Sequence, residues 1–273
     1  MYFDSHCHLN FPELVSRLEA IRSDMQQAGV ARALLISTRV ETFDHVHALA
    51  MAHDNFWCTA GVHPDEDEVI DPTLDQLLDM GRRDKVVAIG ETGLDYYRLG
   101  DRSVADMEWQ RQRFRRHIRA GRQLGLPLVI HTRAASADTL AILREEGEDG
   151  SPAAVGGVFH CFTETAEVAR AALDLGFYIS FSGILTFKNA QDLREVARFV
   201  PLDRILIETD SPYLAPAPFR GKTNDPSLVP WVAKQLADIK SLSPAEMGQI
   251  AFANTQRLFH KIPAFSSIID PTP

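Results

Sequence analysis

Short apolar runs rich in β-branched and aromatic residues alternate with longer amphipathic stretches along most of the chain. The apolar runs predict buried strands at Tyr2–Asp4, Ala33–Ser37, Phe56–Gly61, Val86–Gly90, Pro127–Ile130, Gly157–Phe159, Phe177–Phe181 and Ile205–Ile207. The amphipathic stretches predict helices at Glu13–Ala28, Thr42–Ala52, Thr73–Gly81, Glu108–Leu124, Ala137–Glu146, Glu167–Leu175 and Asn189–Phe199. Because a helix separates each strand from the next, we expect the strands to pair in parallel.

Eight strands that alternate with helices predict an α/β protein with a single (β/α)8 TIM barrel. A doubly wound open sheet is the alternative, but it would not bring all the strand ends around one opening. Two further segments, Pro226–Ile239 and Ser243–Phe259, are expected to close the barrel, and the second begins with the pattern of a capping box. We therefore expect one domain over residues 1–262 and a flexible tail over residues 263–273.

Imidazole and carboxylate side chains gather at the C-terminal ends of these predicted strands, where the active sites of TIM barrels lie. Buried groups of this kind cost free energy unless they are paired or bind a metal ion. A single such histidine is most often structural, but five on four strands, joined by two carboxylates, predict a metal centre. These residues are His6, His8, His63, His131, His160, Glu91 and Asp210. The other histidines are expected at ordinary surface or partly buried positions.

Six of these side chains are our candidate metal ligands, which is more than one tetrahedral zinc ion takes: His6, His8, Glu91, His131, His160 and Asp210. We therefore expect two divalent ions that share a carboxylate, about 3.5–4 Å apart. Glu91, on the fourth strand, is the expected bridge. Asp210, on the eighth strand, lies next to the first strand in a closed barrel and is expected to complete the first site. Zinc, manganese and magnesium all suit such ligands.

The mechanistic hypothesis is hydrolysis by a water molecule that the metal ions acidify. Asp210 and Glu91 are the expected catalytic residues, with Asp210 orienting the water and accepting its proton. Glu208 is expected to hold a ligand histidine in place rather than to bind metal. Arginine suits phosphate through its planar fork of donors. The residues expected to contact substrate are His63, Arg133 and Arg220, with Lys222 near the last.

Cysteine usage and the absence of targeting segments indicate the compartment. The three cysteines are odd in number and far apart, which indicates a reducing environment. Cys7 and Cys161 adjoin candidate ligands but are expected to face away from them on their strands. The N-terminus has no signal-peptide pattern, and no run approaches the ~20 apolar residues of a membrane span. We expect a cytoplasmic protein with no obligate protein partner.

The formal net charge of −9 argues against an extended track for nucleic acid, whose binding requires a basic face. It is compatible with a small pocket that takes a strand end, where metal ions supply the positive charge. The charge therefore narrows the form of a nucleic-acid substrate without excluding one.

The chain resembles the TatD family of metal-dependent deoxyribonucleases, within the amidohydrolase-like TIM barrels. The stretches that carry the resemblance are Asp4–His8, Gly61–Pro64, Gly90–Asp95, His131–Arg133, His160–Thr163, Glu208–Leu214 and Phe219–Asn224. The resemblance implies a divalent metal pair and hydrolysis of DNA phosphodiesters, as a 3′-to-5′ exonuclease on single strands or strand ends. It also implies one ion on His6, His8, Glu91 and Asp210 and another on Glu91, His131 and His160.

Three alternatives remain open. The same centre could hydrolyse an ester or amide, as in the removal of D-amino acids from transfer RNA by some relatives. Dihydroorotase- or phosphotriesterase-like enzymes usually bridge their metals with a carboxylated lysine on the fourth strand, where this chain has Glu91, with Lys85 before the strand. A binding module that has kept the barrel is the non-enzymatic alternative. The sequence leaves the native metal, the natural substrate and the oligomeric state undetermined.

Overall fold

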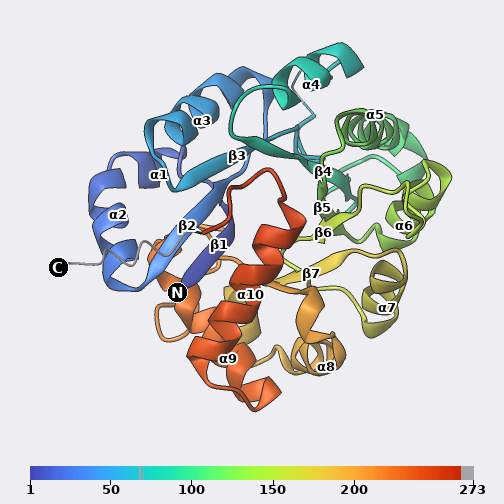
Figure 1. Cartoon of the computed structure of the whole chain (residues 1–273). Coiled ribbons are helices and arrows are strands. Elements are labelled where there is room, and N and C mark those ends of the chain that lie inside the picture. The colour runs from blue at the N-terminus through green and yellow to red at the C-terminus, as the bar shows by residue number, and fades with distance from the viewer. Residues whose placement is uncertain (68, 70, 266–273) are drawn as a thin grey trace.

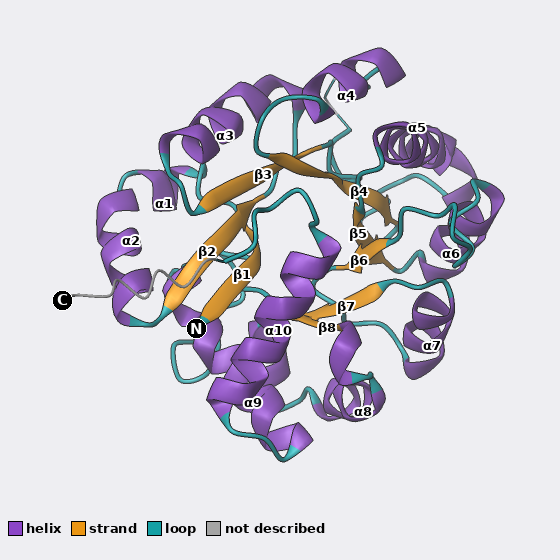
Figure 2. Ribbon diagram, viewed as in Figure 1, coloured by secondary structure: helices purple, strands orange, loops and turns teal. Residues whose placement is uncertain are grey.

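A computed structural model describes residues 1–67, 69 and 71–265, and shows eight parallel strands arranged as a nearly closed ring (Figure 1). The strands follow one another around the ring in chain order, and helices cover their outer side (Figure 2). The predicted TIM barrel is confirmed. The strands are β1 Tyr2–Cys7, β2 Val30–Leu35, β3 Phe56–Ala60, β4 Val86–Asp95, β5 Leu128–Arg133, β6 Gly157–Phe159, β7 Tyr178–Phe181 and β8 Ile205–Ile207.

The helices agree with the amphipathic pattern except near the N-terminus. Two helices replace the single one expected over Glu13–Ala28. The backbone of Arg17 leaves the helical conformation, and the Ser16 hydroxyl donates to the Pro12 carbonyl (3.1 Å). No helix among the described residues is both long and apolar enough to cross a membrane. The helices are α1 Pro12–Val15, α2 Leu18–Gln27, α3 Val40–Ala52, α4 Leu74–Gly81, α5 Glu108–Leu124, α6 Ser136–Glu145, α7 Ala166–Asp174, α8 Gln191–Phe199, α9 Val229–Lys240 and α10 Pro244–Leu258.

Helix α10 closes the end of the barrel where the strands begin, and Figure 1 shows it lying across the ring. Its N-terminus has the predicted capping box, in which Ser243 and Glu246 exchange hydrogen bonds. Phe252 on the helix and Phe259 just after it join one apolar cluster with Phe3 and Trp57 of the strands. The interior below the site is therefore filled with side chains, as in other TIM barrels.

The segment after α10 remains attached to the barrel as far as it is described. The Arg32 guanidinium donates to the Pro263 carbonyl (2.8 Å) and lies 5.1 Å from the centre of the Phe265 ring. Residues 266–273, most of the expected tail, lie outside the described residues. Their flexibility stays a prediction.

No strand ladder among the described residues joins β1 to β8, where the ring closes. The segment after β8 instead meets β1 through one isolated bridge, between Cys7 and Ser211, and the Ser211 carbonyl accepts the His8 amide (2.9 Å). Beside it, the buried Asp4 carboxylate accepts the Thr209 amide (2.9 Å) and the Thr209 hydroxyl. That hydroxyl also lies 3.0 Å from the Ser211 hydroxyl oxygen. A buried carboxylate needs such donors to offset the loss of water, so this contact secures the closure.

Strands β1 and β4 change register with their neighbours where site residues occur. The pairing of β1 with β2 shifts between Asp4 and Cys7, and that of β4 with β5 shifts between Ile89 and Thr92. In β1, two consecutive side chains therefore point into the barrel. The Ser5 hydroxyl bonds the Ser180 hydroxyl of β7, and the His6 ring enters the site. Such irregularities commonly re-aim side chains near active sites.

The closure makes a prediction about stability. Thr209→Val keeps the shape of the side chain but removes the hydroxyl that Asp4 accepts, so we expect a loss of about 1–3 kcal/mol in the free energy of unfolding. Urea unfolding followed by circular dichroism measures it. The control is Thr42→Val on α3, which should change stability by less than about 0.5 kcal/mol. Equal stability of the two variants would contradict a role for this bond in closing the barrel.

Candidate metal centre

The Glu91 carboxylate lies at the centre of a cluster of imidazoles at the C-terminal ends of the strands. One oxygen, Oε2, is 3.4 Å from Nε2 of His6. The other, Oε1, is 2.7 Å from Nε2 of His160, 3.3 Å from Nδ1 of His131 and 3.4 Å from Nε2 of His63. The two oxygens thus face two different groups of imidazoles. A carboxylate in this position can bridge two cations.

The first half of the centre is built by β1 and the segment after β8. Nε2 of His6 lies 3.3 Å from Nε2 of His8 and 3.5 Å from Oδ1 of Asp210, which in turn is 3.4 Å from Nε2 of His8. Atoms bound to one tetrahedral zinc ion at 2.0–2.1 Å are about 3.3–3.4 Å apart. Together with Glu91, these side chains therefore have the spacing of a preformed set of metal ligands.

Asp210 reaches this set through an unusual backbone conformation. Its φ of 54° is in the left-handed region, which few residues other than glycine and Asn or Asp adopt. The Asp210 amide donates to the His6 carbonyl (2.9 Å), which fixes the turn against β1. The sequence places Asp210 on the eighth strand, but β8 ends at Ile207, and this turn brings the carboxylate to the first site instead.

The second half contains His63, Glu91 and His131, whose ligand atoms all lie within 4.8 Å of one another. We expected His63 to contact substrate without a metal role, whereas the structure places it with groups that could hold an ion. The signal for this was its position at the end of the third strand, shared with the other histidines.

Asp95 is a site residue that the sequence analysis missed. Its Oδ2 lies 3.0 Å from Nε2 of His131, opposite the nitrogen that faces Glu91. The pattern of apolar residues ended the fourth strand at Gly90, but β4 continues to Asp95. Glu91 and Asp95 are four residues apart on one strand and so share a face. Recognising the longer strand would have found it.

Glu208 lies beneath the centre, fully buried. Its Oε1 is 3.3 Å from Nδ1 of His160 and accepts the Cys161 amide (2.7 Å). This is the contact expected of a residue that orients a ligand histidine. Its ligand atoms also group with those of His6 and His160 within 4.8 Å, so direct binding is a geometric alternative.

The carboxylates of the centre are held in their ionised form. Burial would raise the pKa of Glu91, but the surrounding imidazoles, His160 foremost, outweigh burial and hold this pKa well below its usual range. The pKa of Asp210 is also lowered, because His8 and its neighbours outweigh burial. Two ionised carboxylates in an enclosed site favour a cation.

The imidazoles divide into two groups. Burial lowers the pKa of His6 and lowers that of His63 to about 3, which leaves both rings neutral and able to donate a lone pair to a metal ion. Burial acts in the same direction on His131 and His160, but neighbouring carboxylates outweigh it and raise the pKa of both. A cation bound to these rings would displace their protons, because it takes the same nitrogen lone pairs.

Unpartnered polar atoms in the cluster fit a metal ion. Oε2 of Glu208, beneath the cluster, is buried without a hydrogen-bond partner. Nε2 of His160 lies only 2.7 Å from a Glu91 oxygen, yet the angles do not make a hydrogen bond. Buried polar atoms are almost always satisfied in folded proteins, and atoms that share an ion approach one another without bonding. The residues present therefore fit a divalent metal.

The two arginines expected to contact substrate are exposed and stack on aromatic rings. The Arg133 guanidinium lies 3.7 Å from the centre of the Tyr97 ring, and that of Arg220 lies 3.9 Å from the centre of the Phe187 ring. Lys222 is also exposed, 5.8 Å from the centre of a neighbouring phenylalanine ring. No hydrogen bond links these cations to the metal cluster among the described residues.

The cysteines and Lys85 are placed as follows. The Cys7 thiol is buried and donates to the Leu34 carbonyl (3.4 Å). Cys161 is not on a strand, and with a φ of 41° it lies beside Ser182 (3.3 Å between sulfur and hydroxyl oxygen). The Lys85 ammonium donates to the Ala50 carbonyl (2.8 Å), so it does not serve as a bridging carboxylated lysine.

His117 contradicts the expectation that the other histidines lie at or near the surface. It is fully buried on α5, where Nε2 accepts the Val62 amide (3.1 Å) and Nδ1 bonds the Arg113 carbonyl (2.8 Å). Since Val62 precedes His63, this histidine supports the loop that carries a site residue.

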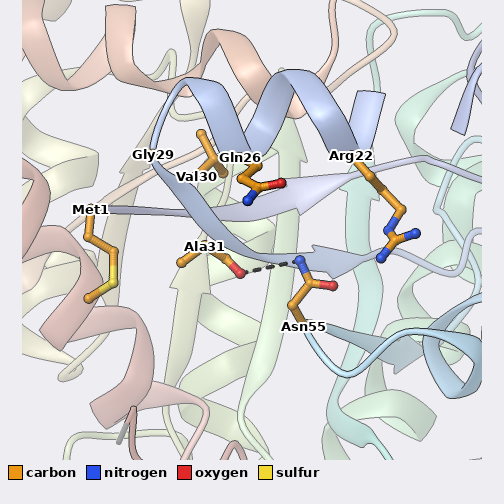
Figure 3. Close-up of a pocket in the computed structure, with 7 residues that line it drawn as sticks. All are labelled: Met1, Arg22, Gln26, Gly29, Val30, Ala31 and Asn55. Atoms are coloured by element: carbon orange, nitrogen blue, oxygen red, sulfur yellow. Dashed lines mark hydrogen bonds between the residues drawn. The ribbon is translucent and has the colours of Figure 1, made fainter. Parts of the chain in front are cut away.

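A separate pocket of about 530 Å³ lies at the opposite ends of the strands (Figure 3). Met1 and Val30, at the starts of β1 and β2, line it, and Asn55 donates to the Ala31 carbonyl (3.3 Å) at its edge. Its lining contains no histidine or carboxylate. The pocket is therefore distinct from the metal cluster.

A TIM barrel with imidazoles and carboxylates around its C-terminal rim defines the class of metal-dependent hydrolases. Residues 3–260 match the family described as TatD related DNase, and the chain belongs to this TatD family. It is 45% identical over 261 residues to the uncharacterized metal-dependent hydrolase YcfH of Escherichia coli K12, covering 94% of this chain and 95% of that protein.

Two further comparisons agree. The uncharacterized metal-dependent hydrolase YabD of Bacillus subtilis is 40% identical over 260 residues, which cover 95% of this chain and 99% of that protein. The crystal structure of YjjV, a TatD homologue from Escherichia coli K12, superposes with a TM-score of 0.86 at 30% identity, covering 95% of this chain and 98% of that chain. The chain is therefore a metal-dependent hydrolase of the TatD family.

Asp95 gives a test of the centre's second half. Asp95→Asn removes the charge opposite His131, and loss of such a partner typically weakens metal binding about 10–100-fold. Calorimetric titration of the metal-free protein with Mn²⁺ or Zn²⁺ should show one weakened binding step and one unchanged step. Asp79→Asn, on the surface of α4, should leave both unchanged. Uniform weakening of every step, or none, would contradict the division into halves.

Proposed function

We propose that this protein is a divalent-metal-dependent deoxyribonuclease that removes nucleotides from the 3′ end of DNA, single-stranded or at strand ends. The observation that carries the proposal is the Glu91 carboxylate, whose two oxygens face separate groups of imidazoles. Two-metal sites of this form are typical of phosphodiester hydrolysis. Membership of a family described as DNases supports the choice of DNA.

The proposed metal ligands are those of the sequence analysis. His63 is a further candidate because it lies beside Glu91. His6, His8, Glu91 and Asp210 would hold one ion, and Glu91, His131 and His160 the other. When bound, such ions stabilise charge on a phosphoryl oxygen and make water a stronger acid. Zinc, manganese and magnesium all suit this ligand set.

The chain's own side chains position the reactants. The side chain of Asp210 is 16% exposed, so it faces the opening while its Oδ1 remains beside His8. It can orient a water molecule and accept its proton at the free oxygen. Glu208 and Asp95 hold His160 and His131 from behind. These contacts hold the imidazoles in place before substrate binds. Reaction is then faster, because the reacting groups need less ordering.

Phosphate recognition falls to exposed cations at the rim. Arg133 follows His131 by two residues on β5, so both side chains lie on one face of that strand. Arg220, in the segment after β8, is the second candidate. With a net charge of −9, these local cations suit a strand end rather than a long duplex. Three cysteines, all free thiols, support the proposed cytoplasmic setting.

Loss of the bridging carboxylate should abolish the reaction. We expect Glu91→Gln to lower kcat/KM on 5′-labelled single-stranded DNA by at least about 10²-fold, since it removes charge where cations are held. Gel analysis of wild type should show a ladder that shortens from the 3′ end, stopped by EDTA and restored by Mg²⁺ or Mn²⁺. Glu41→Gln, exposed on α3, is the control.

The same assay separates the competing activity. A wild-type protein that leaves DNA intact but deacylates a D-aminoacyl transfer RNA would replace the proposal with the ester hydrolase. Binding of metal without hydrolysis of either substrate would support a binding module.

The role of Asp210 predicts a separable defect. Asp210→Asn keeps an oxygen near His8 but cannot accept a proton at neutral pH, so kcat should fall about 10²–10⁴-fold. The KM for DNA should change little. Metal content by elemental analysis must accompany the kinetics. Full activity with metal retained would show that another group accepts the proton.

A further inference from the structure

Two tyrosines are the most exposed large apolar side chains of the described chain. Tyr97 is 60% exposed and Tyr213 is 56% exposed. Tyr97 follows the end of β4 by two residues, and Tyr213 lies in the segment after β8. Both are therefore on the face that carries the metal cluster. Neither ring fills the core, so both are available for contact at this rim.

A chain of ring contacts connects Tyr213 to the first half of the centre. The Phe11 ring stacks on the His8 ring, with centres 4.8 Å apart and planes inclined by 20°. The Tyr213 ring meets the Phe11 ring edge to face, with centres 6.3 Å apart. Tyr213 is thus fixed two rings away from a candidate metal ligand.

Tyr97 is connected to the second half by hydrogen bonds. Its amide donates to Oδ1 of Asp95 (2.8 Å), while Oδ2 of the same carboxylate contacts His131 (3.0 Å). The Arg133 guanidinium covers the ring at 3.7 Å from its centre. A cation so close to one ring face holds the ring in place and leaves an aromatic platform beside a phosphate-binding group.

We propose that Tyr97 and Tyr213 are stacking platforms for the unpaired bases of a single-stranded nucleic acid, one beside each half of the metal centre. This inference rests on the proposed function and deepens it, because it names the side chains that would hold the bases of the substrate. Stacking on aromatic side chains is tolerant of sequence, since every base has a π-face. Within a duplex each base is stacked on its neighbours, and only the terminal pair has a free face. A frayed or single-stranded end therefore binds better than an intact duplex end.

The arrangement assigns complementary tasks to the rim. The phosphate to be cleaved would bind the cations held by Glu91 and its imidazoles, Arg133 would contact the backbone at the rim, and the flanking bases would rest on the tyrosines. Arg220 over Phe187 provides a further cation–aromatic pair, on the segments after β8 and β7. In an acidic protein, stacking on aromatic rings adds affinity to that of a few local cations.

The test compares oligonucleotides with and without bases. One substrate is a single-stranded DNA oligonucleotide, and the other has the same backbone with abasic residues at its last positions. We expect Tyr97→Ala and Tyr213→Ala each to raise KM for the normal oligonucleotide about tenfold or more, with a smaller effect on kcat. The defect should disappear on the abasic substrate. Tyr97→Phe and Tyr213→Phe retain the ring and should rescue KM.

Controls separate stacking from folding. Leu202→Ala removes an exposed apolar side chain just before β8, away from the rim, and should match wild type. If an Ala variant fails to fold, Tyr97→Leu or Tyr213→Leu keeps an apolar side chain without a π-face and gives the same comparison. An equal loss on normal and abasic DNA, or no loss on either, overturns the inference while wild-type cleavage upholds the nuclease. Absence of cleavage by wild type overturns the proposed function itself.

Discussion

The structure of the site depends on one buried negative charge. Glu91 is 2% exposed, and four imidazoles from other strands and strand ends surround its two oxygens. An isolated carboxylate in such a position would cost several kcal/mol, so the imidazoles and any cation between them are what makes burial favourable. Because those partners come from segments far apart in the sequence, the charge is satisfied only when the ring of strands is complete. Site and fold are thus energetically coupled through this residue.

Closure of the ring and geometry of the first half are also coupled. Asp4 holds Thr209, and the next residue after Thr209 is Asp210, which the His6 carbonyl fixes in its left-handed turn. The contact that joins β8 to β1 therefore sets the distance between the carboxylate of one segment and the imidazoles of the other. The register shifts in β1 and β4 act in the same direction, since they turn ligands toward the centre where regular pleating would not.

The sequence predicts the barrel and the cluster well because both follow from local patterns. Apolar runs fix where strands lie, and a histidine or carboxylate directly after such a run can be recognised without tertiary information. The ends of the strands and the buried positions on helices are harder to predict. Asp95 escaped because Gly90–Asp95 mixes polar and small residues, and its place in β4 depends on pairing with β5. The burial of His117 was not predicted, because the many arginines around it on α5 are typical of an exposed helix face. The proximity of His63 to Glu91 and the stacking of Arg133 on Tyr97 depend on side-chain directions that spacing does not encode.

Helix α10 determines where substrate can enter the barrel and where products can leave it. Phe252 and Phe259 pack with strand residues such as Phe3 and Trp57 at the end where the strands begin. The barrel is therefore closed at that end and open only at the C-terminal ends of the strands. A polymer cannot thread through it. A substrate can therefore enter only at the C-terminal ends of the strands, and its products must leave through the same opening. For the proposed polymer substrate, each released fragment would have to exchange with the remaining strand at this one opening.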